Sequence, residues 1–183
     1  MSRMILVTGG ARSGKSAYAQ GLAESLPGPR TYVATCPVTD AEIAERIRKH
    51  RQARSEQAWQ TLEEPLDLPA ALTQATGSPT VLIDCLTLWI NNLMYQAAGD
   101  NRPLFEEDVH RSCQALIEAV QRHPGTVIVV SGEVGLGIVP ENREARLFRD
   151  LLGRCNQLLA ASADQVTLVA CGLPLHLKQE NLP

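Results

Sequence analysis

The residues with the clearest chemical purpose form one glycine-rich segment, Gly9-Gly10-Ala11-Arg12-Ser13-Gly14-Lys15-Ser16. It matches GxxxxGK[ST], the phosphate-binding loop (P-loop) motif, and it lies between an apolar run and a helical pattern. Glycines let successive backbone N–H groups turn inward around phosphate oxygens, and the N-terminus of the following helix adds partial positive charge. Lys15 would reach the β- and γ-phosphates, and the Ser16 hydroxyl would ligate Mg²⁺. Because a chance glycine-rich turn rarely has this context, the segment predicts nucleotide binding.

A second candidate is Asp84, which ends the apolar run Thr80–Asp84. A carboxylate at the end of a buried strand could hold Mg²⁺ directly or through water. The alternative is a helix cap or a turn, which the following Cys85-Leu86-Thr87 permits. Beside a P-loop, we favour the metal role.

A cationic cluster contains a third candidate, His50. Five basic residues fall close together with no acid among them, namely Arg46, Arg48, Lys49, Arg51 and Arg54. On a helix, Arg46, His50 and Arg54 would share one face. Neighbouring cations favour a neutral imidazole, which can attack phosphorus. The alternative is a solvated face of an amphipathic helix, with Ile43 and Ile47 turned toward the core.

Short apolar runs and helical patterns alternate along the chain and must position these residues. We expect strands at 4–8, 30–35, 80–84, 126–131 and 165–171. We expect helices at 16–26, 39–54, 104–122 and 140–161, the second opened by a capping box and the last with Pro140 in its first turn. Continuous apolar strands are typical of a parallel sheet covered by helices on both faces. The fold class predicted is α/β, with a single domain over residues 1–183.

Composition narrows the function further. The chain has 183 residues and a net charge of −3, so no overall basic field indicates nucleic acid as a partner. No apolar run is long enough to cross a bilayer, and we expect a cytoplasmic protein. The five scattered cysteines are expected to be small buried hydrophobes, and His110, His123 and His176 to be surface residues. An NKxD motif is absent, and the one DxxG, at 150–153, falls inside a helical pattern, which disfavours a switch GTPase.

Several segments together resemble one known family. They are residues 5–16, 32–35, Arg46-Ile47 with His50 and Arg54, Trp59 with Thr61 and Glu63, 84–89, 133–135, 137–143, 145–146, 148–150, Gly153 and 156–157. The chain is similar over nearly its whole length to the bifunctional adenosylcobinamide kinase/adenosylcobinamide-phosphate guanylyltransferases of cobalamin biosynthesis. The resemblance implies a P-loop NTPase domain with a RecA-like, mostly parallel sheet.

The resemblance also implies the chemistry. ATP or GTP would phosphorylate a hydroxyl of adenosylcobinamide. GTP would then donate GMP to adenosylcobinamide phosphate through a guanylylated histidine, for which His50 is the matching position. Lys15 would assist catalysis, and Mg²⁺ would be held by Ser16 and Asp84. The nucleotide site would comprise Gly9, Gly10, Ala11, Arg12, Ser13, Gly14, Lys15, Ser16, Thr35, Cys36, Arg51, Gln52, Ala53, Arg54, Glu63 and Asp84. Such proteins suggest a homo-oligomer, with a trimer as one candidate form.

One departure from the family pattern is visible, and two other functions remain open. The family usually has Asn immediately before Glu133-Val134-Gly135, whereas this chain has Gly132. That change puts in doubt any side-chain contact from this position. From the residues alone, the alternatives are a small-molecule kinase without guanylyl transfer and a nucleotide-binding regulatory module.

Overall fold

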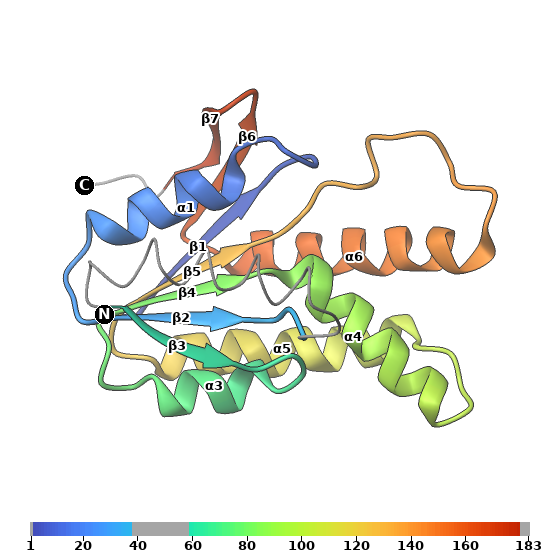
Figure 1. Cartoon of the computed structure of the whole chain (residues 1–183), viewed down its shortest axis with the longest axis horizontal. Coiled ribbons are helices and arrows are strands. Elements are labelled where there is room, and N and C mark those ends of the chain that lie inside the picture. The colour runs from blue at the N-terminus through green and yellow to red at the C-terminus, as the bar shows by residue number, and fades with distance from the viewer. Residues whose placement is uncertain (1, 38–58, 180–183) are drawn as a thin grey trace.

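The computed structural model describes residues 2–37 and 59–179 (Figure 1). Seven strands form one sheet in the order β3-β2-β4-β5-β1-β6-β7. The strands are β1 (Arg3–Thr8), β2 (Arg30–Ala34), β3 (Trp59–Glu63), β4 (Thr80–Asp84), β5 (Thr126–Val130), β6 (Gln165–Ala170) and β7 (Leu173–Lys178). All pairings are parallel except that of β7 with β6. The predicted α/β class with a mostly parallel sheet is confirmed.

The helices cover both faces of this sheet because its central strands are apolar on both sides. The described helices are α1 (Lys15–Glu24), α3 (Leu68–Gln74), α4 (Leu86–Gly99), α5 (Glu106–Arg122) and α6 (Arg143–Ser162). On β1, Ile5 and Val7 pack with α1 in one core cluster, whereas Met4 and Leu6 pack in the other cluster with the remaining helices. The alternation follows from the two-residue period of a strand.

The predicted buried strands are all present, with bounds that differ by one residue at most. The helix predicted over 39–54 lies outside the described residues. Pro140 is not in the first turn of α6, so that prediction is wrong. The helix begins at Arg143, because the side chain of Asn142 caps it by accepting hydrogen bonds from the N–H groups of Glu144 and Ala145 at 2.7 and 3.1 Å.

Two predictions about burial are also corrected. His123 is buried, not on the surface, because it ends α5 and its ring is used by backbone groups: Nδ1 accepts from the Gly125 N–H at 3.1 Å. Of the cysteines, Cys113 and Cys155 are buried as expected, Cys36 and Cys85 are half-buried, and Cys171 is exposed. Cys171 lies in the tight turn between β6 and β7, with a φ of 54°.

Candidate active site

The P-loop joins β1 to α1 at the carboxyl edge of the sheet, where ligands bind in open α/β folds. Gly14 precedes α1 with a φ of 92°, a left-handed conformation that glycine adopts without strain. Among the described residues, no side chain caps this helix. The first backbone N–H groups of α1 are therefore available to phosphate oxygens at the positive end of the helix dipole.

Two neighbouring segments brace this loop. The N–H of Gly172, in the β6–β7 turn, donates to the carbonyl of Ser13 at 2.8 Å, and the N–H of Glu133, after β5, donates to the carbonyl of Gly9 at 3.0 Å. The ammonium group of Lys15 donates to the carbonyl of Gly10 at 3.1 Å. The loop backbone is thus fixed from both adjacent strands, β5 and β6.

Asp84 lies at the same edge, two strands from β1. Val130 of β5 is in register with Val7 of β1 and with Asp84 of β4, so β5 separates the P-loop from this carboxylate. Tyr32 donates its hydroxyl to Oδ2 of Asp84 at 3.1 Å. The helix that follows, α4, has Cys85 and not Asp84 as its N-cap residue.

Thr35 and Cys85 connect β2 to β4 behind this carboxylate. The Thr35 hydroxyl donates to the Cys85 carbonyl at 2.8 Å and accepts from the Cys85 N–H at 2.7 Å, and Thr35 is fully buried. Burial raises the pKa of the Cys85 thiol, and the negative charge of Asp84 raises it further. Thr35 therefore holds the backbone that follows Asp84.

The structure brings part of the predicted site to one edge. Residues 9–16, Thr35, Cys36 and Asp84 all lie at carboxyl ends of parallel strands or directly after them, and exposed Glu63 ends β3 in the same register row as Asp84. Four strand spacings separate β1 from β3, about 19 Å, so Glu63 is remote from the P-loop. His50 and Arg51, Gln52, Ala53 and Arg54 lie outside the described residues.

Sequence reasoning missed a polar network beside the P-loop. Glu133 Oε1 accepts from the Thr8 hydroxyl at 2.9 Å and from the Asn156 amide at 3.1 Å, and Ser131 donates its hydroxyl to Oδ1 of Asn156. Asn156 is buried on α6 in the middle of an otherwise apolar stripe, which was the one local signal available. The network ties β1, the end of β5 and α6 together.

A cavity of about 720 Å³ lies elsewhere, between α4, the connection after it and the first turns of α6. Tyr95, Leu104 and Phe148 are among its lining residues, and none of the lining belongs to the P-loop or Asp84. In the described part of the chain, no three His, Cys, Asp or Glu side chains converge as a metal-binding group. No described helix combines the length and apolarity required to cross a membrane.

The mostly parallel sheet with a P-loop after the inner strand β1 places the chain in the P-loop NTPase class, with a RecA-like fold. Two solved structures share that fold. One is an ATPase domain (TM-score 0.60, 13% identity, 100% of this chain and 78% of that one). The other is the flagellar accessory protein FlaH from Methanocaldococcus jannaschii (TM-score 0.55, 15% identity, 97% of this chain and 79% of that one).

The family described as "Cobinamide kinase / cobinamide phosphate guanyltransferase" matches residues 5–177, and the chain belongs to it. "Bifunctional adenosylcobalamin biosynthesis protein CobU" of Escherichia coli (strain K12) is 43% identical over 96% of this chain and 99% of its own length. "Bifunctional adenosylcobalamin biosynthesis protein CobP" of Pseudomonas aeruginosa is 42% identical over 97% of this chain and 98% of its own. The family resemblance inferred from the sequence is confirmed.

Proposed function

We propose that this chain phosphorylates adenosylcobinamide with ATP or GTP, and then transfers GMP from GTP to adenosylcobinamide phosphate. The observation that carries the proposal is the match of residues 5–177 to a family with both activities. A P-loop with an uncapped helix behind it supports the same conclusion, because it offers backbone N–H groups to a nucleotide triphosphate.

In the first reaction, the P-loop residues 9–16 hold the nucleotide phosphates. Lys15 neutralises charge that builds up on the transferred γ-phosphoryl group and on the leaving nucleoside diphosphate. The braces from Gly172 and Glu133 fix the loop before the substrate arrives, so little reorganisation is needed during the reaction.

The second reaction proceeds through His50. Its imidazole attacks the α-phosphorus of GTP, an N–P bond forms, the bond from the α-phosphorus to the bridging oxygen breaks, and pyrophosphate leaves. The corrinoid phosphate then attacks the phosphoramidate, takes up GMP and frees the histidine. The basic residues Arg46, Arg51 and Arg54 close to His50 in the sequence support this role, since they would offset charge on the phosphoryl oxygens.

Mg²⁺ fits the donors that the site offers. The Ser16 hydroxyl and the Asp84 carboxylate supply oxygen atoms, the donor type that Mg²⁺ requires. Two protein ligands are enough, because Mg²⁺ usually takes its remaining ligands from phosphate oxygens and water. Bound there, the ion would neutralise phosphate charge. Thr35 would support the backbone behind Asp84, and Cys36 and Glu63 would contact only a part of the nucleotide that extends away from the P-loop toward β3.

The proposal extends to the organisation of the protein. A single domain, residues 1–183, carries both reactions in the cytoplasm and assembles into a homo-oligomer. The uninterrupted seven-stranded sheet supports the single domain, because its inner strand β1 pairs with β5 and β6 from the second half of the chain.

Intact-protein mass spectrometry after incubation with GTP and Mg²⁺ tests the guanylyl transfer. The wild-type chain is expected to gain the mass of GMP as an acid-labile adduct, and His50→Ala to gain none. His110→Ala, a change on the exposed face of α5, is the matched control and is expected to form the adduct. A wild-type chain that binds GTP and forms no adduct would indicate a kinase without guanylyl transfer.

A further inference from the structure

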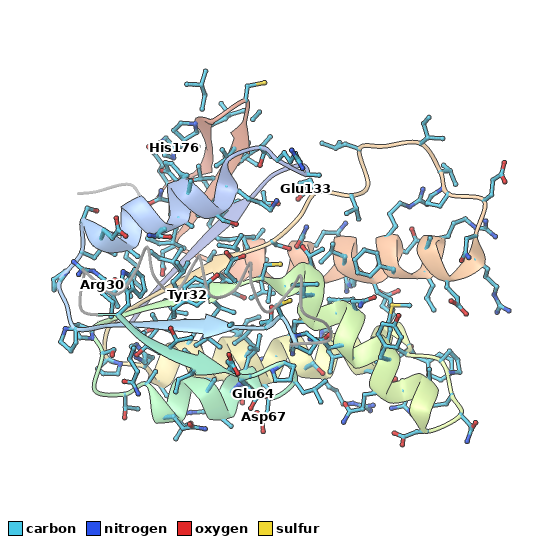
Figure 2. All side chains as sticks on the ribbon, in the orientation of Figure 1. Arg30, Tyr32, Glu64, Asp67, Glu133 and His176 are labelled. Atoms are coloured by element: carbon cyan, nitrogen blue, oxygen red, sulfur yellow. The ribbon has the colours of Figure 1, made fainter. Side chains whose placement is uncertain are left out.

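The carboxylate of Glu133 lies between the two parts of the site that the proposed phosphoryl transfer uses. Val130, the last residue of β5, is in register with Val7 and with Asp84, and Glu133 follows β5 at the same edge of the sheet. Its N–H donates to the Gly9 carbonyl at 3.0 Å. Figure 2 shows Glu133 beside the loop that joins β1 to α1. The side chain is thus next to the segment that binds phosphate.

One oxygen of this carboxylate is anchored and the other is available. Thr8 and Asn156 both donate to Oε1, at 2.9 and 3.1 Å, and Asn156 is itself held by Ser131. Among the described residues, no hydrogen bond uses Oε2. A carboxylate oxygen has further lone pairs to offer, and here its direction is set by the anchored partner.

The charge on Glu133 is not neutralised by a basic side chain. Within residues 2–37 and 59–179, no Lys or Arg forms an ion pair with it. A purely structural residue at this position would need only an acceptor for Thr8 and Asn156, which a neutral glutamine would also provide. An anionic group with one unused oxygen beside the phosphate site can in addition accept a proton.

We propose that Glu133 is the general base of the phosphoryl transfer, an inference that rests on the proposed kinase activity. The substrate hydroxyl gives its proton to Oε2 of Glu133. The hydroxyl oxygen forms a bond to the γ-phosphorus, the bond from that phosphorus to the β–γ bridging oxygen breaks, and the nucleoside diphosphate leaves. The proton then passes from Glu133 to solvent.

Glu133→Gln separates this role from a structural one. The amide oxygen still accepts from Thr8 and Asn156, but the side chain no longer takes up a proton. With ATP and adenosylcobinamide, kcat for phosphorylation is expected to fall about 10²- to 10⁴-fold, while KM for ATP and the GMP adduct formed from GTP stay unchanged. Glu107→Gln, on the exposed face of α5, is the control with the same chemical change and is expected to keep full activity.

Three results would overturn the assignment. A Glu133→Gln protein that phosphorylates the corrinoid at the wild-type rate has no need of this base. If the variant loses both ATP binding and the GMP adduct, Glu133 acts by bracing the P-loop. If both reactions of the variant require a higher Mg²⁺ concentration, Glu133 acts as part of the metal site. If Glu133→Gln is too unstable to assay, Glu133→Asp must show reduced kcat at unchanged KM for ATP. A wild-type chain that forms no phosphorylated corrinoid would instead overturn the proposed function, and the inference with it.

Discussion

At the residue scale, two polar side chains of the candidate site, Lys15 and Thr35, are held by backbone atoms. Lys15 donates to the Gly10 carbonyl, and Thr35 bridges both backbone groups of Cys85. These hydrogen bonds do not require a second side chain, so a substitution at a neighbouring position leaves both partners present. The effect of a substitution at Lys15 on the reaction rate can therefore be measured separately from its effect on stability.

Lys15→Met is expected to reduce kcat/KM for phosphorylation about 10²- to 10³-fold, because it removes the cation that stabilises negative charge on the transferred phosphoryl group in the transition state. Steady-state kinetics with ATP and adenosylcobinamide check this. Lys178→Met removes an equally long cation from the exposed strand β7, where it bonds the carbonyls of Ala160 and Ala161, and should leave the rate unchanged. Equal losses in the two variants would show a general effect of charge and not a role at the phosphates.

Thiol labelling should distinguish Cys171 from Cys85. Cys171 is exposed in the β6–β7 turn, whereas burial and the Asp84 charge raise the pKa of the Cys85 thiol. Since the thiolate is the reactive form, iodoacetamide at neutral pH should alkylate Cys171 well before Cys85. Peptide mass spectrometry over time measures both. Labelling of Cys85 first would contradict the position of this residue against Thr35.

At the element scale, the described helices differ in how their N-terminal N–H groups are satisfied. Among the described helices, α1 and α4 begin at the carboxyl edge of the sheet without a side-chain cap, whereas α6 and α3 are capped by Asn142 and Asp67. An uncapped start leaves N–H groups for a ligand, and a capped start stabilises the helix itself. Of these helices, α1 follows the P-loop directly, so its free N–H groups lie where phosphate would bind.

The free energy of unfolding at acidic pH should depend on Asp108, in the first turn of α5. Hydrogen bonds from Arg102, and then from the Phe105 N–H, lower the pKa of Asp108. Because the pKa of Asp108 is lower in the folded state than in the unfolded state, its ionised carboxylate stabilises the folded state at pH values above the unfolded-state pKa. This stabilisation is lost as the pH falls below about 4 and through the folded-state pKa. Urea unfolding between pH 7 and 3 should therefore show a smaller loss of stability on acidification in Asp108→Asn than in the wild type. Equal pH slopes would contradict the role of this cap.

The position at which the chain departs from its family should be sensitive to any side chain. A Cβ atom on Gly132 would lie 2.8 Å from Oγ1 of Thr87, which now accepts the Gly132 N–H at 2.8 Å. Gly132→Ala is expected to lower the free energy of unfolding by about 1 kcal/mol through loss of this hydrogen bond. In a Thr87→Ala background the same change should cost less, and a double-mutant cycle from chemical denaturation measures the difference. Additive effects would show that Thr87 is not the obstacle.

How much could be predicted from the sequence differs from element to element. The P-loop with β1 and α1 followed from one motif, and the buried strands followed from continuous apolar runs. Strands β3 and β7 were missed because they lie at the sheet edges and expose much of their surface, so neither has such a run. Helix α4 was not predicted, because 86–99 has no strong capping signal at its start. The Glu133 network joins residues 125 positions apart, and its one local sign was the polar Asn156 within the apolar stripe of α6.

At the scale of the whole molecule, the single sheet predicts one cooperative unfolding transition. Trp89 is buried on α4, and Trp59 lies on β3 at the sheet edge, so their fluorescence reports one half of the fold while far-UV circular dichroism reports all of it. The two denaturation curves should coincide. A fluorescence transition at lower denaturant would show that the β2–β3 side unfolds separately, and would argue against a single domain.

The order of the strands across the sheet differs from their order along the chain. β1 precedes every other described strand, yet its neighbours are β5 and β6, and its loop is braced by Gly172. A nascent chain therefore carries the whole phosphate-binding sequence long before anything holds that sequence in shape. A nascent chain that ends before residue 133 carries the motif without either brace, so it is expected to bind nucleotide more weakly than the full chain.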